Sequence, residues 1–252
     1  MTRTAEGDAA LIAAQLQEAG SAERAAGSQN YLKSPMPFSG TTVPAARAIV
    51  TGWRRAHPQL TGLHLTQVAA ALWDGEFFEC RLAAVILLAD RRTLLTAADA
   101  ALVEQLLRSS GTWALVDSLA ADVMGSLVGR FPAELHPVLD RWAADDNFWL
   151  RRSALLALLV PLRRGDPANF DRFARYADTM LGEREFFIRK AIGWVLRETG
   201  RRQPDLVAGW LAPRIHRASG VTISEAVKWL PAAEREALLT AYRELRTGRK
   251  AG

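Results

Sequence analysis

Cysteine, histidine and long hydrophobic runs are all scarce in this 252-residue chain. The single cysteine, Cys80, excludes a disulfide within the chain and fits a reducing compartment; no histidine lies near it, so a catalytic thiol is not expected. The four histidines are scattered without metal-ligand spacing, and we expect neither a metal nor another cofactor. No apolar stretch reaches the roughly 18 residues of a membrane span, and the N-terminus lacks a signal-peptide pattern. The sequence therefore predicts a cytoplasmic protein.

Positive charge is unevenly distributed along the chain. Residues 1–126 contain 10 Lys and Arg against 12 Asp and Glu, a net charge of −2. Residues 127–252 contain 22 against 15, a net charge of +7. A basic half favours a polyanionic partner such as nucleic acid, although a surface tuned for solubility would show the same excess.

Strand signals are missing, and helical periodicity dominates. Apolar residues recur at i, i+3, i+4 and i+7 in segments rich in Ala, Leu, Arg and Glu, which predicts about a dozen helices. The segments are 43–55, 65–73, 78–88, 98–107, 116–128, 150–162, 188–196 and 234–245. Residues 1–30 are predicted to form one helix followed by a loose linker over residues 20–30, where small and polar residues cluster.

Three segments of the chain resemble one another. Residues 76–83, 147–154 and 185–192 each contain an aromatic pair, then a basic residue four positions after the first aromatic, then an apolar run. Phe77, Trp113, Phe148 and Phe186 follow one another at intervals of 36, 35 and 38 residues. This period suits two-helix repeats of the HEAT or armadillo kind. We expect an all-α solenoid that forms a single domain over residues 1–252.

Equivalent positions of a solenoid line up in a row across its surface. Here the row contains four cations and one carboxylate, namely Arg81, Asp117, Arg152, Lys190 and Lys228. On a concave face this row would form a basic groove that suits a phosphate backbone. The alternative is that the cations form ion pairs with neighbouring repeats and that Asp117 only neutralises Arg81 or Arg152.

Two of the eight tryptophans lie beside this row. Trp113 precedes Asp117 by one helical turn, and Trp194 follows Lys190 by one turn, so each pair shares a helix face. Aromatic faces pack on sugars and bases and stabilise cations, although both tryptophans could equally serve helix packing. Four other tryptophans occupy positions suited to the core: Trp53, Trp142, Trp210 and Trp229.

Three motifs carry a family resemblance. They are Trp113-Ala-Leu-Val-Asp117-Ser118, Trp142-Ala-x-x-Asp146-Asn147-x-Trp149-Leu150-x-Arg152 and Glu185-Phe-Phe-Ile-x-Lys190-Ala-Ile-Gly-Trp-Val-Leu-Arg197-Glu198. From about residue 30 onward, the chain resembles the bacterial alkylpurine DNA glycosylases of the AlkD type, which have HEAT-like repeats. The resemblance implies a catalytic site made of Asp117, Trp113 and Trp194. The segment around Thr42 lacks the family's Gln, so contacts from the first helices are the least secure part of this likeness.

The resemblance also implies a set of residues that bind DNA or support the lesion site. Arg152 and Arg197 correspond to phosphate contacts, Tyr31 to an aromatic that completes the lesion site, and Phe186 and Phe187 to the wall behind it. From the repeat row we add three cations as DNA contacts: Arg81, Lys190 and Lys228.

The chemistry expected of these residues is hydrolysis of the N-glycosidic bond of cationic alkylated purines, of the 7-methylguanine and 3-methyladenine type. The base of such a lesion already carries a positive charge, so one carboxylate that stabilises charge on the sugar is sufficient. We expect an abasic product without strand cleavage and a bacterial, nucleoid-associated monomer on double-stranded DNA. A solenoid groove offers no obvious pocket, and the family resemblance implies that the lesion is recognised through the DNA backbone and the charge of the base, without base flipping. The alternatives are a non-catalytic HEAT-repeat protein that binds damaged or branched DNA and a scaffold for protein partners.

Overall fold

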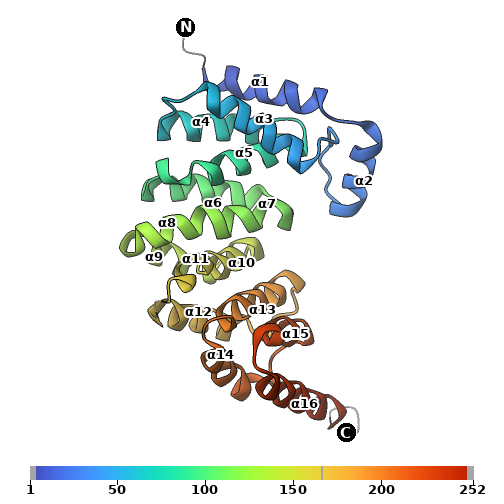
Figure 1. Cartoon of the computed structure of the whole chain (residues 1–252), viewed down its shortest axis with the longest axis vertical. Helices are drawn as coiled ribbons and strands as arrows, with labels where there is room; N and C mark the ends of the chain where they lie inside the picture. The colour runs from blue at the N-terminus through green and yellow to red at the C-terminus, as the bar shows by residue number, and fades with distance from the viewer. Residues whose placement is uncertain (1–3, 166, 249–252) are drawn as a thin grey trace. The chain divides into compact units, whose positions relative to one another are not determined.

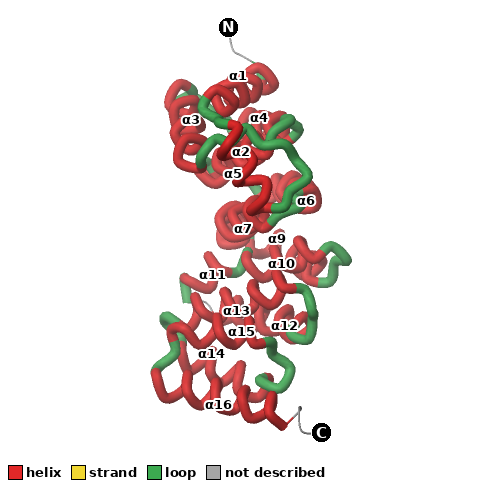
Figure 2. The backbone as a smooth tube through the Cα atoms, turned by 90° about the vertical axis from the view of Figure 1, so that its right-hand side faces the viewer, coloured by secondary structure: helices red, strands yellow, loops and turns green. Residues whose placement is uncertain are grey.

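The computed structural model describes residues 4–165 and 167–248, and these residues form helices joined by loops, without a strand (Figure 2). The chain divides into two compact units, Met1–Leu135 and His136–Gly252, and the boundary lies inside α9 (Pro132–Ala143). The prediction of an all-helical fold is confirmed. The prediction of a single domain stays a prediction, and each unit is described by itself below.

The first unit is built around α5, in which nine of thirteen residues are buried. Its side chains pack against α3, α4 and α7, and α1 packs on α3 and α4 (Figure 1). The helices of this unit are α1 (Ala5–Glu18), α2 (Ala22–Leu32), α3 (Val43–Ala56), α4 (Gly62–Trp73), α5 (Phe78–Asp90), α6 (Ala100–Ser109), α7 (Trp113–Ser118) and α8 (Gly125–Arg130), with 3-10 turns η1 (Arg92–Leu94) and η2 (Ala97–Asp99).

The loose linker predicted for residues 20–30 is wrong, because these residues form most of helix α2. Ser21 caps the helix by accepting a hydrogen bond from the amide of Arg24 at 3.4 Å, and Ala, Glu, Arg and Gln are good helix formers. None of the residues of α2 is buried. This segment has no apolar stripe of the kind that identifies an amphipathic helix in a sequence, so the helix was not predicted.

The predicted helix 116–128 is interrupted by a π-helical stretch, η3 (Leu119–Met124), between α7 and α8. Leu119, Ala120, Val123 and Met124 are buried, so apolar periodicity continues through the altered hydrogen-bond pattern. Short π-helical stretches are rare and often occur at functional sites. This one begins two residues after Asp117.

The second unit is built around α13 (Phe186–Gly200), which packs against α10, α14 and α15. Gly193 allows α15 to approach closely, since a Cβ atom there would lie 2.7 Å from the Cβ atom of Glu225 and 2.9 Å from the carbonyl oxygen of Thr222. The other helices of this unit are α10 (Phe148–Leu156), α11 (Leu159–Arg163), α12 (Pro167–Met180), α14 (Pro204–Leu211), α15 (Gly220–Ala226) and α16 (Ala232–Gly248), with 3-10 turns η4 (Ala212–Arg214) and η5 (Val227–Trp229).

Three of the four tryptophans expected in the core are buried, namely Trp53, Trp142 and Trp210. Trp229 is 51% exposed, so its placement in the core is wrong. It ends the short turn η5, and the guanidinium of Arg201 lies 4.5 Å from its ring centroid. A cation over the face of the ring gives this exposed indole a polar partner.

Cys80 is a buried free thiol, and burial raises its pKa. Within the described residues, no helix combines the length and the apolar character needed to cross a membrane. No cluster of three or more His, Cys, Asp or Glu side chains with the arrangement of a metal site occurs in the same residues.

Candidate functional site

Helix α7 presents Trp113 and Asp117 at successive turns of one face. The hydroxyl of Thr112 caps the helix by accepting a hydrogen bond from the amide of Ala114 at 3.4 Å, which places Trp113 at the first helical position. Trp113 is 36% exposed, and Asp117 is half-buried. The carboxylate is therefore neither locked in the interior nor on a fully exposed surface.

Tyr31, at the end of α2, meets Trp113 edge to face. Their ring centroids are 6.3 Å apart and the rings are inclined by 84°, a favoured geometry for an aromatic pair. Tyr31 is 73% exposed, which is unusual for an aromatic side chain without a ligand or partner. The sequence could not reveal this pair, because 82 positions separate the two residues.

A cavity of about 390 Å³ opens beside this pair. The first unit thus contains a cavity where no obvious pocket was expected, and the absence of base flipping stays a prediction. The cavity is lined by side chains from helices α2, α3, α5 and α7 and from the connection between α2 and α3. Its lining combines aromatic, aliphatic and hydroxyl side chains: Tyr31, Phe38, Thr41, Thr42, Phe78, Leu82, Val85, Ile86, Trp113 and Ser118 among others.

Two charged side chains of opposite sign also line this cavity. Arg47 is exposed, and Glu79 is only 3% exposed. Ser118, which follows Asp117 directly, lines the cavity too and donates its hydroxyl hydrogen to Asp122 Oδ2 at 2.7 Å. An aromatic surface with a cation at an exposed position suits a ligand that combines a positively charged aromatic ring with a phosphate.

Arg81 lies apart from this cavity. Its guanidinium stands 5.1 Å from the Trp73 ring centroid, and its Nε and Nη1 groups donate to the carbonyl oxygens of Trp73 at 3.2 Å and Ser109 at 2.8 Å. Burial lowers the pKa of Arg81, and the charge of Asp74 partly offsets this. These contacts bind Arg81 to its own fold, and its role on DNA stays a prediction.

Arg152 in α10 is 2% exposed, the lowest value among the basic residues of the repeat row. Its Nη1 group donates to the carbonyl oxygen of Phe187, and its guanidinium lies 5.7 Å from the Phe187 ring centroid. A side chain this deeply buried offers a phosphate little surface. The geometry shows that Arg152 braces the start of α13, and its contact with a phosphate stays a prediction.

The aromatic residues at the start of α13 form one cluster with those of α10. Phe187 stacks with Phe148 at 6.4 Å and contacts Trp149 at 4.9 Å between ring centroids. Phe186 meets Phe187 edge to face at 5.4 Å and is 52% exposed. These residues form an aromatic cluster with one exposed member, Phe186, and their role as the wall behind the lesion stays a prediction.

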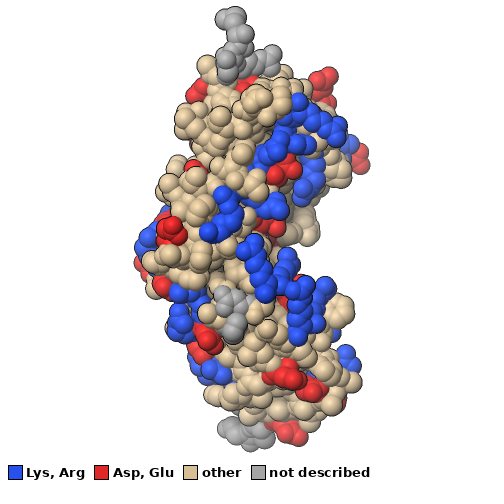
Figure 3. All heavy atoms as spheres, turned by 60° about the vertical axis from the view of Figure 1, so that its left-hand side comes forward, with Lys and Arg blue, Asp and Glu red and all other residues tan. Residues whose placement is uncertain are grey.

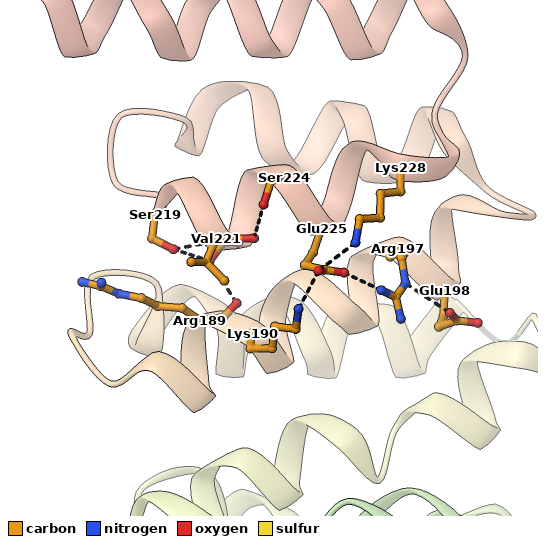
Figure 4. A network of polar contacts seen from close by, with 10 residues as sticks. Arg189, Lys190, Arg197, Glu198, Ser219, Val221, Ser224, Glu225 and Lys228 are labelled. Atoms are coloured by element: carbon orange, nitrogen blue, oxygen red, sulfur yellow. Dashed lines mark hydrogen bonds and ion pairs between the residues drawn. The ribbon is translucent and has the colours of Figure 1, made fainter. Parts of the chain in front are cut away.

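Three predicted DNA contacts converge on a single carboxylate, that of Glu225 in α15 (Figure 4). Lys190 Nζ lies 2.6 Å and Lys228 Nζ 2.8 Å from Glu225 Oε1, and Arg197 Nη1 contacts Oε2. Glu225 is 5% exposed, whereas the lysine side chains are 42% and 48% exposed. The ion-pair interpretation of the repeat row therefore applies to these lysines. Glu198 also pairs with Arg197 at 3.4 Å, so three cations and two carboxylates leave the cluster with a net charge of +1.

Glu225 is the residue of this cluster that the sequence analysis missed. Burial alone would raise its pKa, but the hydrogen bonds from Lys190 and Lys228 and the charges of Lys190 and Arg197 lower its pKa to about 2. A signal was available, because Glu225 and Lys228 are three residues apart and face each other on one helix surface. Trp194 is half-buried on α13, between Lys190 and Arg197 in sequence.

Basic and acidic side chains lie close together on the face drawn in Figure 3. Groups of Lys and Arg appear there with Asp and Glu among them. The second unit contains ion pairs of this kind, such as the contact between Arg214 and Asp178 at 2.7 Å and that between Arg151 and Glu183 at 2.9 Å. The positive charge of the second half is therefore partly neutralised locally.

Comparison with known proteins identifies relatives over most of the chain. The sequence profile of a family described as "DNA alkylation repair enzyme" matches residues 12–230. A predicted DNA alkylation repair enzyme from Enterococcus faecalis has a similar structure with a TM-score of 0.75 and 23% identity, over 84% of this chain and 97% of that one. AlkD2 from Streptococcus mutans has a TM-score of 0.57 and 17% identity, over 76% of this chain and 91% of that one. No curated protein sequence matches this chain.

Proposed function

Because the chain belongs to the DNA alkylation repair enzyme family, we propose that it hydrolyses the N-glycosidic bond of cationic alkylated purines in double-stranded DNA. The products are the free base, of the 7-methylguanine or 3-methyladenine type, and an abasic site. The observation that carries the proposal is local to the first unit. An exposed Tyr31–Trp113 pair borders a cavity, and Asp117 follows Trp113 by one turn on the same helix face.

Asp117 acts on the sugar in this mechanism. As the glycosidic bond breaks, positive charge moves from the base to the deoxyribose, and a nearby carboxylate stabilises that charge and orients the attacking water. Two unit charges about 4 Å apart interact by about 4 kcal/mol at an effective dielectric constant near 20. This corresponds to roughly a thousandfold in rate, which water around the half-buried carboxylate reduces.

Tyr31 and Trp113 contact the damaged nucleotide in this mechanism. The face of each ring attracts a cation, with about 0.5–2 kcal/mol for each contact. The attraction discriminates by charge, because an undamaged purine is neutral. The arrangement supports selection of the lesion by its charge and requires no general acid to protonate the leaving base.

The second unit supplies contacts to the DNA backbone in this proposal. Lys190 and Lys228 are about half-exposed, and the excess positive charge around Glu225 leaves them able to approach a phosphate. The roles expected of Trp194 at the catalytic site and of Phe186 in the wall behind the lesion stay predictions. Arg152 and Phe187 support this surface from behind, since the arginine is buried.

The test is release of methylated bases from alkylated double-stranded DNA, measured by mass spectrometry with EDTA present. We expect the wild type to release 7-methylguanine or 3-methyladenine and to leave an abasic, unbroken strand. Asp117→Asn should lose most of this activity, roughly a hundredfold to a thousandfold, and still bind abasic-site DNA. Asp90→Asn is the matched control, because Asp90 is exposed, lies outside the cavity lining and, within the described residues, forms its ion pairs with Arg54 and Arg91.

Wild-type rates in Asp117→Asn would remove the carboxylate from the mechanism. Binding to damaged DNA without any base release by the wild type would support the non-catalytic alternative. Activity that disappears with EDTA would require a metal and contradict the mechanism.

A further inference from the structure

Helix α2 carries Tyr31 to the cavity without being packed into the core. None of its residues is buried, and in Figure 1 it lies beside the ends of α1 and α3 instead of within their stack. Burial of apolar side chains ordinarily fixes the position of a helix. Something other than core packing must therefore hold Tyr31 against Trp113.

The connection between α2 and α3 provides this hold, through a strap formed by residues 38–41. Glu79 in α5 accepts a hydrogen bond from the backbone amide of Ser39 at Oε2 and from that of Gly40 at Oε1, each at 2.9 Å. Both oxygens of the carboxylate are therefore engaged by the strap. Among the described residues, no Lys, Arg or His forms an ion pair with Glu79, so the two amide groups are the compensation for its buried charge.

The strap is joined closely to the first turn of α2. Gly40 has a φ of +79°, and a Cβ atom there would lie 2.1 Å from the carbonyl oxygen of Ser21. Arg24 in α2 donates from Nε to the carbonyl oxygen of Gly40 at 2.8 Å. A shift of the strap would therefore shift α2 with it.

Phe38, the first residue of the strap, is held by Phe78, which precedes Glu79 in α5. Phe38 stacks on Phe78 with ring centroids 4.7 Å apart, and the amide of Phe78 donates to the carbonyl oxygen of Pro37 at 2.9 Å. The first turn of α5 thus binds both the aromatic and the polar side of the strap. Phe38, Phe78 and Glu79 all line the cavity that Tyr31 borders.

We propose that Glu79 is a positioning residue for the Tyr31–Trp113 pair. By collecting the amides of Ser39 and Gly40, it fixes the strap and α2, and so holds Tyr31 edge-on to Trp113 beside the cavity. The inference rests on the proposed function for its kinetic consequence, but the restraint on α2 stands on geometry alone. A glutamine at this position keeps the shape, yet its amide nitrogen cannot accept the second backbone hydrogen bond.

The decisive experiment is a double-mutant cycle in the full-length chain. Single-turnover rates of 7-methylguanine release are measured for the wild type, Glu79→Gln, Tyr31→Ala and the double variant. We expect Glu79→Gln to lower the rate by about tenfold, as loss of a charge-assisted hydrogen bond does, and to add nothing in the Tyr31→Ala background. Glu76→Gln is the matched control, because Glu76 is exposed three residues away. Independent, additive losses would overturn the proposal, since a merely structural residue would act without Tyr31.

Limited trypsin cleavage after Lys33, the residue that follows α2, supplies a readout that does not need enzymatic activity. Cleavage should be faster in Glu79→Gln than in the wild type or Glu76→Gln, and equal cleavage in all three would refute the restraint. Arg24→Gln loosens the strap from the side of α2 and repeats both tests should Glu79→Gln fail to fold. Suppose that Glu79→Gln keeps the wild-type fold and is cleaved faster, but that the wild type itself releases no methylated base. This result would refute the proposed function and leave the restraint on α2 intact.

Discussion

Replacement of Glu225 by glutamine should destabilise the second unit at neutral pH but not at acidic pH. The side chain is nearly isosteric, so the change removes the negative charge between Lys190, Lys228 and Arg197 and little else. The pKa of Glu225 is about 2, against 4.5 for an ordinary glutamate. Because the folded state lowers this pKa, the carboxylate stabilises the fold above pH 4.5 and loses that contribution as the pH falls toward 2.

The magnitude follows from the shift and from the exposure of the partners. A shift of this size corresponds to at most about 3 kcal/mol. Water screens the half-exposed lysine ammonium groups, which reduces the expected loss to about 1–2 kcal/mol at pH 7. A buried carboxylate with three cationic partners is worth more than a surface pair, but less than its full Coulomb energy.

Urea unfolding of the wild type and Glu225→Gln, repeated between pH 7 and pH 2.5, measures this difference. Subtracting one free energy of unfolding from the other cancels the other titrating groups, so the difference should shrink steadily below pH 4.5. Glu236→Gln is the control, because Glu236 is 66% exposed and its pair with Arg243 should contribute little at any pH. A difference that stays constant from pH 7 to pH 2.5 would refute the electrostatic reasoning and indicate a packing effect.

Two further predictions concern the second unit. Lys190→Ala and Lys228→Ala should each weaken binding to all DNA sequences alike and lower the slope of log Kd against log salt by about one, as measured by fluorescence anisotropy; a sequence-selective effect would contradict a backbone contact. Gly193→Ala should destabilise the protein by about 1–3 kcal/mol, because the new methyl group would overlap Glu225 and separate α13 from α15. The control is Gly209→Ala in α14, where no atom lies within 4 Å of the added Cβ and denaturation should show no loss.

The helices were predictable because their signals are local. Apolar residues at i, i+3, i+4 and i+7 identified α3, α4, α5, α13 and α16, and the four-residue spacing of Trp113 and Asp117 placed both on one helix face. The family was predictable for a related reason, since its motifs are short stretches of consecutive residues. These features depend on neighbours along the chain, and the sequence contains them directly.

Helix α2 marks where local reasoning failed. Its composition is polar and small, so nothing in the pattern distinguished an exposed helix from a linker. The prediction for Trp229 was wrong in the opposite direction. Its apolar character suggested burial, but its position at the end of a short turn leaves it exposed. In both cases, exposure depends on what packs against a residue, which a linear pattern does not record.

Tertiary structure alone decided the partners of the candidate site residues. It brought Tyr31 against Trp113, buried Arg152 behind Phe187, and gathered Lys190, Arg197 and Lys228 around Glu225. Charge and aromaticity belong to a residue wherever it lies, so the sequence indicates which side chains are able to bind a ligand. Which of them remain open to a ligand depends on contacts between segments far apart in sequence, because burial and ion pairing arise only when those segments pack.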